Sequence, residues 1–197
     1  MEAKQVAVDI KTYGMELRLV SAHLPTGEAT VGSYARELQK LKKVLRTQSS
    51  KTIICGVDTN AQLGKASTEA ETQVLGQHAS GTRNSRGRQP MSTMLETGAF
   101  AVDTFSSQEG REWTHTQVRD GTVAITWIDH VLMIHLPKTS LTQIQDVPLG
   151  VNSTDHRPLI TQFPTGGQKR NPKYPQQAKW FTARSFQFIN TVTEALK

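Results

Sequence analysis

The sequence predicts an α+β fold, a layered β-sandwich with helices packed against it. Six or seven short apolar segments have strand periodicity and mostly follow one another at hairpin spacing, whereas only two segments have helical periodicity. The chain has 197 residues, 36% of them hydrophobic, which is enough for the core of one domain. Together these observations predict a single domain in which strands form the layers and two helices cover them.

The first part of the chain predicts a hairpin, a helix and a buried strand. Residues Gln5–Ile10 and Glu16–Ala22 alternate apolar and polar side chains, and a Tyr-Gly pair between them favours a turn. A helix is expected at Ser33–Arg46, because its apolar residues recur at helical spacing and Ser33 is a suitable N-cap. The continuous apolar run Thr52–Val57 is typical of a strand buried on both faces.

The rest of the chain predicts loops, a short helix and further strands. Residues 62–89 have no apolar period and are expected to form a loop, and Pro90–Thr97 predicts a helix with Pro90 at its first position and Gly98 ending it. Further strands are expected at Ala101–Phe105, Glu112–Thr116, Ile125–Ile134, Leu141–Val147 and Leu159–Phe163. Residues 164–176 predict a Pro- and Gly-rich linker, followed by a small helix that contains Phe181, Phe186, Phe188 and Ile189.

Cysteine content and hydropathy exclude a secreted disulfide scaffold, a membrane protein and a cysteine-based zinc domain. Cys55 is the only cysteine, so no disulfide can form within the chain, and the polar N-terminus lacks the pattern of a signal peptide. No apolar run approaches the roughly 18 residues that a membrane-spanning helix needs. We therefore expect an intracellular protein, nuclear or cytoplasmic, that is not secreted and has no membrane partner.

The net charge of +6 comes entirely from the end of the chain. Residues 1–156 hold equal numbers of acidic and basic residues, and the basic residues that follow include Lys169, Arg170 and Lys173. A basic tail can neutralise phosphates and bind nucleic acid without sequence preference, although a solvated linker explains it equally well. Arg83, Arg86 and Arg88 form a second basic cluster, which is either a nucleic-acid contact or a solvated loop.

Polar side chains stand at the ends of apolar strands at four places in the sequence. They are His23, the pair Asp58 and Asn60, Asp129, and the pair Asp155 and His156. Taken singly, an Asp-x-Asn sequence is most often a turn, and a histidine at a strand end is most often a satisfied polar residue. Asp129 lies inside an expected apolar strand, where a carboxylate needs a partner, and a histidine is the natural one.

The order of these residues resembles the endonuclease/exonuclease/phosphatase superfamily. The segments SAHLP, GVDTNA, WIDHV and STDHRPL, at residues 21–25, 56–61, 127–131 and 153–159, match its successive motifs. Gly76–Arg88, Val102–Phe105 and Trp113–His115 are similar to segments of non-LTR retrotransposon endonucleases, which precede a reverse transcriptase in the same polypeptide. The resemblance implies a DNase-like fold, here an incomplete two-sheet sandwich flanked by helices, and a DNA endonuclease with a downstream reverse transcriptase as a partner.

The resemblance also implies a set of catalytic roles. Phosphodiester hydrolysis with Mg²⁺, or with Mn²⁺, needs an activated water, a neutralised phosphoryl group and a proton for the leaving oxygen. By the family pattern, Asp58 would orient or deprotonate the water, with Asn60 on the phosphate or on Asp58, and Asp129 would hold His156 toward the phosphate. His23 would serve the leaving group, and Asp155 and Asp58 would be the metal ligands.

Two upstream motifs of the superfamily have no counterpart in the sequence. These are a strand that ends in Asn and a second strand that ends in the Glu that is the main metal ligand. We therefore expect residues 1–163 to correspond to the C-terminal two-thirds of such a domain, with 164–197 as a basic linker and short helical tail. Poor metal affinity and weakened activity should follow.

Two other functions remain open at this stage. A phosphatase, deadenylase or sphingomyelinase-like phosphoesterase has the same fold. His23 stands where retrotransposon enzymes usually have Tyr and where pancreatic-type deoxyribonucleases and deadenylases have His. A non-catalytic remnant that binds nucleic acid through its basic tail is the other alternative. Substitution of Asp58 separates enzyme from remnant, because only an enzyme loses turnover while binding persists.

Overall fold

The computed structural model describes residues 5–12, 15–26, 29–46, 51–107, 112–138, 140–146 and 154–163. The predicted linker and tail, with Lys169, Arg170 and Lys173, lie outside the described residues, as does the end of the strand expected at Leu141–Val147.

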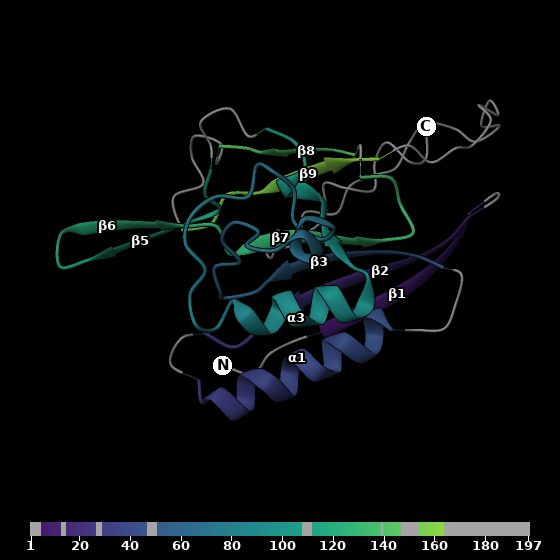
Figure 1. Cartoon of the computed structure of the whole chain (residues 1–197), viewed down its shortest axis with the longest axis horizontal. Helices are drawn as coiled ribbons and strands as arrows, with labels where there is room; N and C mark the ends of the chain where they lie inside the picture. Colours follow the sequence, from purple (N-terminus) through teal and green to yellow (C-terminus); the bar gives the residue numbers. More distant parts are fainter. Residues whose placement is uncertain are drawn as a thin grey trace, which may run out of the picture.

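A five-stranded mixed sheet forms the centre of the fold, with the strand order β1-β2-β3-β7-β4 (Figure 1). Its strands are β1 (Gln5–Thr12), β2 (Met15–His23), β3 (Thr52–Asp58), β7 (Asp129–Ile134) and β4 (Phe100–Ala101). The predicted hairpin is present as the antiparallel pair β1–β2, and β3 runs parallel to β2. Every residue of β3 is buried, as its apolar run predicts.

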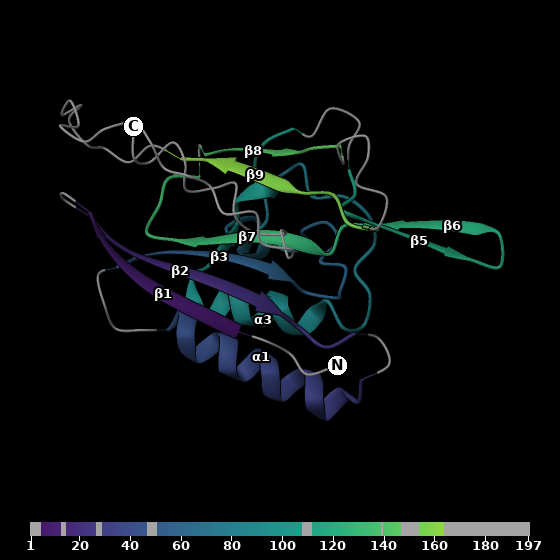
Figure 2. The same ribbon diagram turned by 180° about the vertical axis from the view of Figure 1, so that it is seen from behind.

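Helices α1 (Val31–Leu45) and α3 (Arg88–Thr97) lie together on one face of the sheet, and the view from behind shows the strands in front of them (Figures 1 and 2). The apolar stripe of α1 is buried as predicted: Tyr34, Leu38, Leu41 and Leu45. No helix in the part of the chain that the structure describes has the length and apolar character needed to cross a membrane.

The helix ends differ in detail from the prediction. The N-cap of α1 is Thr30 and not Ser33, because the Thr30 side chain accepts a hydrogen bond from the backbone nitrogen of Ser33 at 3.2 Å. Helix α3 begins at Arg88, so Pro90 is its third residue and not its first. Gly98 ends α3 as predicted, with a φ of 71° that suits glycine.

Two predicted strands are wrong. The Thr104 hydroxyl donates to the Ala101 carbonyl at 2.6 Å and ends one of them, and the Thr59 segment interrupts the other. The strand expected at Ala101–Phe105 is only β4, followed by the 3₁₀ helix η1 (Val102–Thr104). The strand expected at Ile125–Ile134 is divided into β6 (Thr122–Thr126) and β7. Between them, the carbonyl of Ile128 accepts hydrogen bonds from the backbone nitrogen and hydroxyl of Thr59, at 2.8 and 2.7 Å.

The remaining strands form two separate pairs. Strand β5 (His115–Arg119) begins later than the expected Glu112–Thr116 and pairs with β6 in a hairpin that projects from the body in both views (Figures 1 and 2). Strands β8 (Leu141–Ile144) and β9 (Leu159–Gln162) form a two-stranded sheet beyond β7. The predicted α+β class is confirmed, and among the described residues the second sheet has two strands.

Residues 62–89 form a packed loop that contains one short helix, α2 (Glu69–Thr72), and ends in the first two residues of α3. The prediction of a loop is largely confirmed, but its apolar residues Leu63, Val74, Leu75 and Ala79 are buried. Two glycines allow this packing: a Cβ at Gly87 would lie 2.0 Å from the carbonyl oxygen of Gln62, and one at Gly76 would lie 2.2 Å from that of Thr104. Glycine is therefore required at Gly87, where the two ends of the loop meet, and at Gly76, where the loop meets the segment of Thr104.

Candidate active site

Three polar side chains end up side by side on one edge of the central sheet. His23 is the last residue of β2, Asp58 is the last of β3, and they are register partners. Asp129 is the register partner of Asp58. Asp129 is the first residue of β7, whereas the sequence predicted it in the middle of a strand. Because β7 runs antiparallel to β3, its start lies at the sheet edge where β3 ends. Register partners share a face of the sheet, so all three side chains point to one side.

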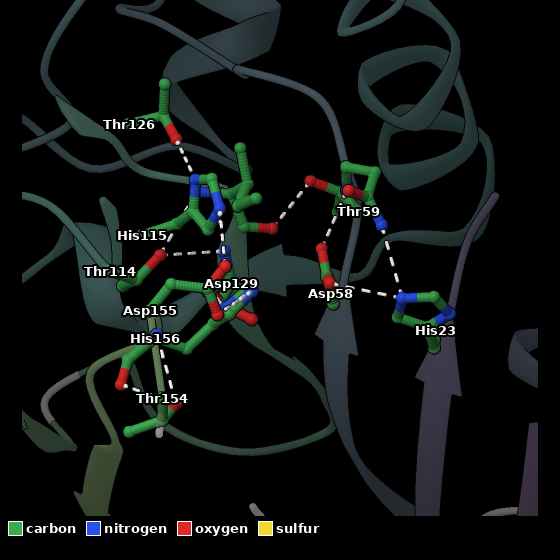
Figure 3. Close-up of polar contacts among 12 residues, drawn as sticks. His23, Asp58, Thr59, Thr114, His115, Thr126, Asp129, Thr154, Asp155 and His156 are labelled. Atoms are coloured by element: carbon green, nitrogen blue, oxygen red, sulfur yellow. Dashed lines mark hydrogen bonds and ion pairs between the residues drawn. The ribbon is translucent and has the colours of Figure 1, made fainter. Parts of the chain in front are cut away.

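His156 completes this group from a segment distant in the sequence. Its Nδ1 lies 2.8 Å from Oδ2 of Asp129, which is the histidine partner that the sequence predicts for this carboxylate (Figure 3). Burial works against the charged imidazole, but the hydrogen bond and charge of Asp129, with the charges of Asp58 and Asp155, raise the pKa of His156 overall. Asp129 thus fixes the ring orientation and favours the protonated form.

Asp58 is mostly buried at the centre of the group. One carboxylate oxygen accepts a hydrogen bond from the backbone nitrogen of Asn60 at 2.8 Å, and the other lies 3.4 Å from Nε2 of His23 (Figure 3). Burial, followed by the negative charge of Asp129, raises the pKa of Asp58. A raised pKa makes the ionised carboxylate a stronger base, which suits a group that accepts a proton.

Asn60 adopts a left-handed backbone conformation with a φ of 46°, which asparagine tolerates better than most residues. Its side-chain Nδ2 donates a hydrogen bond to the carbonyl of Leu24 at 2.8 Å and lies 3.4 Å from Nε2 of His23. The residue therefore joins the end of β3 to the end of β2 and keeps His23 and Asp58 together.

Thr114 is a residue that the sequence placed in a matching segment without giving it a role. It is fully buried, and its hydroxyl accepts hydrogen bonds from the backbone nitrogens of Ile128 and Asp129, at 3.2 and 3.0 Å. Its carbonyl also accepts from the backbone nitrogen of Arg157 at 2.7 Å. Thr114 thus connects the Asp129 side of the site to the His156 segment.

His115 lies next to these residues and was likewise given no role from the sequence. A β-bridge pairs it with His156, and its Nε2 lies 3.5 Å from Oδ2 of Asp155. Asp155 is much more exposed than the other acidic residues here, with 66% of its side chain accessible. His156, the next residue in the sequence, lies between two carboxylates. Its Nδ1 contacts Asp129, and its Nε2 lies 3.8 Å from Oδ1 of Asp155.

Two of the three clustered arginines are engaged within the fold. Arg83 forms a bidentate ion pair with Glu71, at 2.6 and 2.8 Å. Arg86 donates hydrogen bonds to the carbonyls of Pro25, Thr26 and Ala29. Arg88 is exposed at the first turn of α3. Nucleic-acid binding by these arginines stays a prediction, and the structure gives Arg83 and Arg86 a different use.

Two clusters of described residues offer donors for a metal ion, each with its donor atoms within 4.8 Å of one another. One is Asp58, Asp129 and His156, and the other is His115, Asp155 and His156. The first suits a hard divalent cation, because such a cation would relieve the repulsion through which Asp129 raises the pKa of Asp58.

The comparisons with known proteins show the fold. No protein-family model and no curated protein matches the sequence. The endonuclease domain of TRAS1, a telomere-specific non-LTR retrotransposon, is similar over 81% of this chain and 63% of that domain, at 20% identity and a TM-score of 0.54.

Staphylococcus aureus beta toxin matches at 12% identity and a TM-score of 0.48, over 81% of this chain and 56% of the toxin. D. rerio TDP2, solved with a single-strand DNA product, matches at 12% identity and 0.46, over 79% and 59%. This chain therefore spans less than two thirds of the length of these structures. The chain has the DNase-like fold of the endonuclease/exonuclease/phosphatase proteins, as the motifs in its sequence predicted.

Proposed function

We propose that this chain hydrolyses phosphodiester bonds of DNA with the help of a divalent metal ion, as an endonuclease of retrotransposon type. The observation that supports this most is the alignment of His23, Asp58 and the Asp129–His156 pair on one edge of the sheet. A solved structure that shares this fold at a TM-score above 0.5 is an endonuclease domain of a non-LTR retrotransposon.

Mg²⁺, or Mn²⁺ in its place, is the proposed metal ion. The sequence predicted Asp58 and Asp155 as its ligands, but among the described residues Asp58 shares a donor cluster with Asp129 and His156 and not with Asp155, so we propose Asp58 and Asp129 as the carboxylate ligands. When bound, the ion would neutralise charge on the phosphoryl group and make a coordinated water more acidic. Two carboxylates are few charged ligands for a hard cation, and neither donor cluster among the described residues contains a glutamate. We therefore expect weak binding that saturates only at millimolar metal.

The protein side chains divide the proton transfers. Asp58, whose pKa is raised by burial and by Asp129, accepts a proton from the attacking water. His156, held by Asp129 through its Nδ1, presents Nε2 and a positive charge to the phosphate, where negative charge increases in the transition state. His23, 3.4 Å from Asp58, is placed to protonate the leaving oxygen, and Asn60 keeps these two side chains together.

Three further predictions belong to the same proposal. A reverse transcriptase in the same polypeptide, an intracellular location and an additional nucleic-acid contact by Lys169, Arg170 and Lys173 would all suit an endonuclease of this type. The three basic residues act in this proposal through phosphate charge, so their effect should diminish steeply with salt.

Nicking of supercoiled plasmid tests the proposal. The purified chain is incubated with plasmid in millimolar Mg²⁺, in Mn²⁺ and in EDTA, beside His156→Ala and Asp58→Asn. His135→Asn is the matched control, because His135 is an exposed histidine just after the other end of β7. We expect slow nicking that needs the metal, is abolished in His156→Ala and Asp58→Asn, and is unchanged in His135→Asn.

The alternative substrates define the outcomes that would overturn the proposal. Polyadenylated RNA, sphingomyelin and a simple phosphomonoester are offered to the same proteins. Hydrolysis of one of these, with plasmid left intact, would make the chain a different phosphoesterase of the same fold. Plasmid binding that survives in every variant, without hydrolysis by folded protein, would make it a non-catalytic nucleic-acid-binding protein.

A further inference from the structure

Two imidazole rings and a carboxylate meet beside the proposed catalytic group. Nε2 of His115 lies 3.5 Å from one carboxylate oxygen of Asp155, and Nε2 of His156 lies 3.8 Å from the other (Figure 3). The two rings are 4.7 Å apart between centroids, and one donor atom from each of the three residues lies within 4.8 Å of the others. Their ligand atoms are thus gathered around one small volume.

The other ring nitrogens of both histidines already have partners. Nδ1 of His156 lies 2.8 Å from the Asp129 carboxylate, which can only accept, so this nitrogen carries the proton when the ring is neutral. Nδ1 of His115 lies 3.1 Å from the hydroxyl of Thr126, which can accept in the same way. With the proton of each neutral ring on Nδ1, Nε2 can act as a ligand on the side where Asp155 lies. Metal-binding histidines are typically oriented by such a partner on their second nitrogen.

Backbone hydrogen bonds hold the three residues in place. The His115–His156 bridge is flanked by a bond from the backbone nitrogen of Thr116 to the carbonyl of Asp155, at 2.8 Å, and by one from Arg157 to Thr114, at 2.7 Å. The ligand set therefore stands on paired backbone, which limits the reorganisation needed to bind an ion.

We infer that His115, Asp155 and His156 form a site for a transition-metal ion of the Zn²⁺ class, distinct from the Asp58–Asp129 carboxylate pair. Two imidazoles and one carboxylate, with a fourth position open to solvent, are a ligand set typical of Zn²⁺. Mg²⁺ prefers oxygen ligands and would select the carboxylate pair instead. The exposed side chain of Asp155 gives the ion a path from solvent.

Direct binding of Zn²⁺ to the full chain tests the site. Zn²⁺ is titrated in competition with a chromophoric chelator, and Co²⁺ is added separately to record its visible spectrum. His115→Gln and Asp155→Asn should each weaken Zn²⁺ binding at least tenfold and change the Co²⁺ bands, since each loses a ligand. Asp58→Asn and His135→Asn should bind Zn²⁺ as the wild type does, and circular dichroism verifies that every variant is folded.

The outcomes separate this site from the other donor cluster. If Zn²⁺ affinity is unchanged in His115→Gln, these three residues do not hold the ion and the inference is wrong. If it falls in Asp58→Asn instead, the ion is bound by the cluster of Asp58, Asp129 and His156, and the inference is equally wrong. Binding is measured without turnover, so this result does not depend on whether the chain cleaves DNA.

A second readout rests on the proposed function. An ion at this site occupies Nε2 of His156, so Zn²⁺ should inhibit plasmid nicking by the wild type at concentrations that leave His115→Gln active. Equal inhibition of both proteins would show that the ion does not reach Nε2 of His156 through this ligand set.

Discussion

The ion pair between Glu71 and Arg83 should control how stability depends on pH. Arg83 binds both carboxylate oxygens of Glu71, and the backbone nitrogen and hydroxyl of Ser67 bind one of them as well, at 2.6 and 2.9 Å. Arg83 also donates to the carbonyl of Leu63 at 2.7 Å and to that of Lys65 at 3.0 Å. Through these bonds the ion pair holds separate parts of the loop of residues 62–89 together. Glu71→Gln is the smallest change that removes the negative charge of Glu71.

The size of the expected change in stability follows from the ionisation of the Glu71 carboxyl group. The hydrogen bonds from Arg83 lower the pKa of Glu71 from 4.5 to about 2, against a smaller opposing effect of burial. Each pKa unit corresponds to about 1.4 kcal/mol, so the charged form contributes roughly 3 kcal/mol to the free energy of unfolding at neutral pH. The Glu71 side chain is mostly covered by its partners, but the ion pair lies close to the surface, so solvent screening makes roughly 3 kcal/mol an upper value.

The direction of the pH dependence is that of a group whose pKa is lower in the folded protein than in the unfolded chain. The contribution is complete above the unfolded-state pKa of Glu71 and is lost as the pH falls from about 4.5 to about 2. Urea unfolding followed by circular dichroism should therefore show wild type and Glu71→Gln differing by at most about 3 kcal/mol at pH 7 and by less than half of the pH 7 difference at pH 3. Glu69→Gln, an exposed residue of the same helix, is the control and should unfold as the wild type does.

A difference between wild type and Glu71→Gln that stays constant from pH 7 to pH 3 would refute this reasoning. It would mean that the glutamine is tolerated or disfavoured for its shape rather than for its missing charge. An equal loss in Glu69→Gln would likewise show that the effect belongs to the helix and not to the ion pair.

Three other changes test the site and the helix ends. Asp129→Asn should lower the nicking rate at least a hundredfold with the fold intact by circular dichroism, because His156 loses the carboxylate that orients and charges it; a normal rate would remove this pair from the proposal. Thr30→Ala should cost about 1 kcal/mol in urea unfolding, whereas Ser33→Ala should cost almost nothing; the opposite order would restore Ser33 as the N-cap. Gly98→Ala should cost about 1 kcal/mol through its positive φ alone, because a Cβ there meets no atom within 4 Å; a much larger loss in the same urea titration would point to a clash.

Periodicity in the sequence predicted those elements whose stability depends on a single buried face. The apolar stripe of α1 and the apolar run of β3 are such patterns, and both elements are present nearly as expected. The grouping of His23, Asp58 and Asp129 was also accessible, because each polar residue stands beside an apolar strand segment. A histidine partner for Asp129 could be anticipated because a carboxylate in an apolar strand needs one, and the family resemblance identified that histidine as His156.

Elements that depend on distant side chains could not be predicted in this way. Asp103 is completely buried, and its carboxylate binds His130 at 2.8 Å and the backbone nitrogen of Val131 at 2.9 Å. These bonds reach across 27 and 28 residues, and no local pattern marks them. The hydroxyl of Thr114 likewise accepts hydrogen bonds from the backbone nitrogens of Ile128 and Asp129, at a point where the sequence predicted an unbroken strand. A hydroxyl or carboxylate that satisfies another segment's backbone ends a strand without any signal within that strand.

The arginines show why charge in a sequence is a weak guide to a binding surface. Arg83, Arg86 and Arg88 are close in the sequence and look equivalent, yet Arg83 neutralises a mostly buried glutamate, and Arg86 satisfies carbonyls while its guanidinium lies 4.9 Å from the ring centre of Tyr34. A guanidinium with such partners must lose them before it can bind a phosphate, whereas an exposed one gives up only water. Of the three, Arg88 is therefore the residue whose replacement should weaken DNA binding without lowering stability, and Arg83 is the one whose replacement should do the reverse.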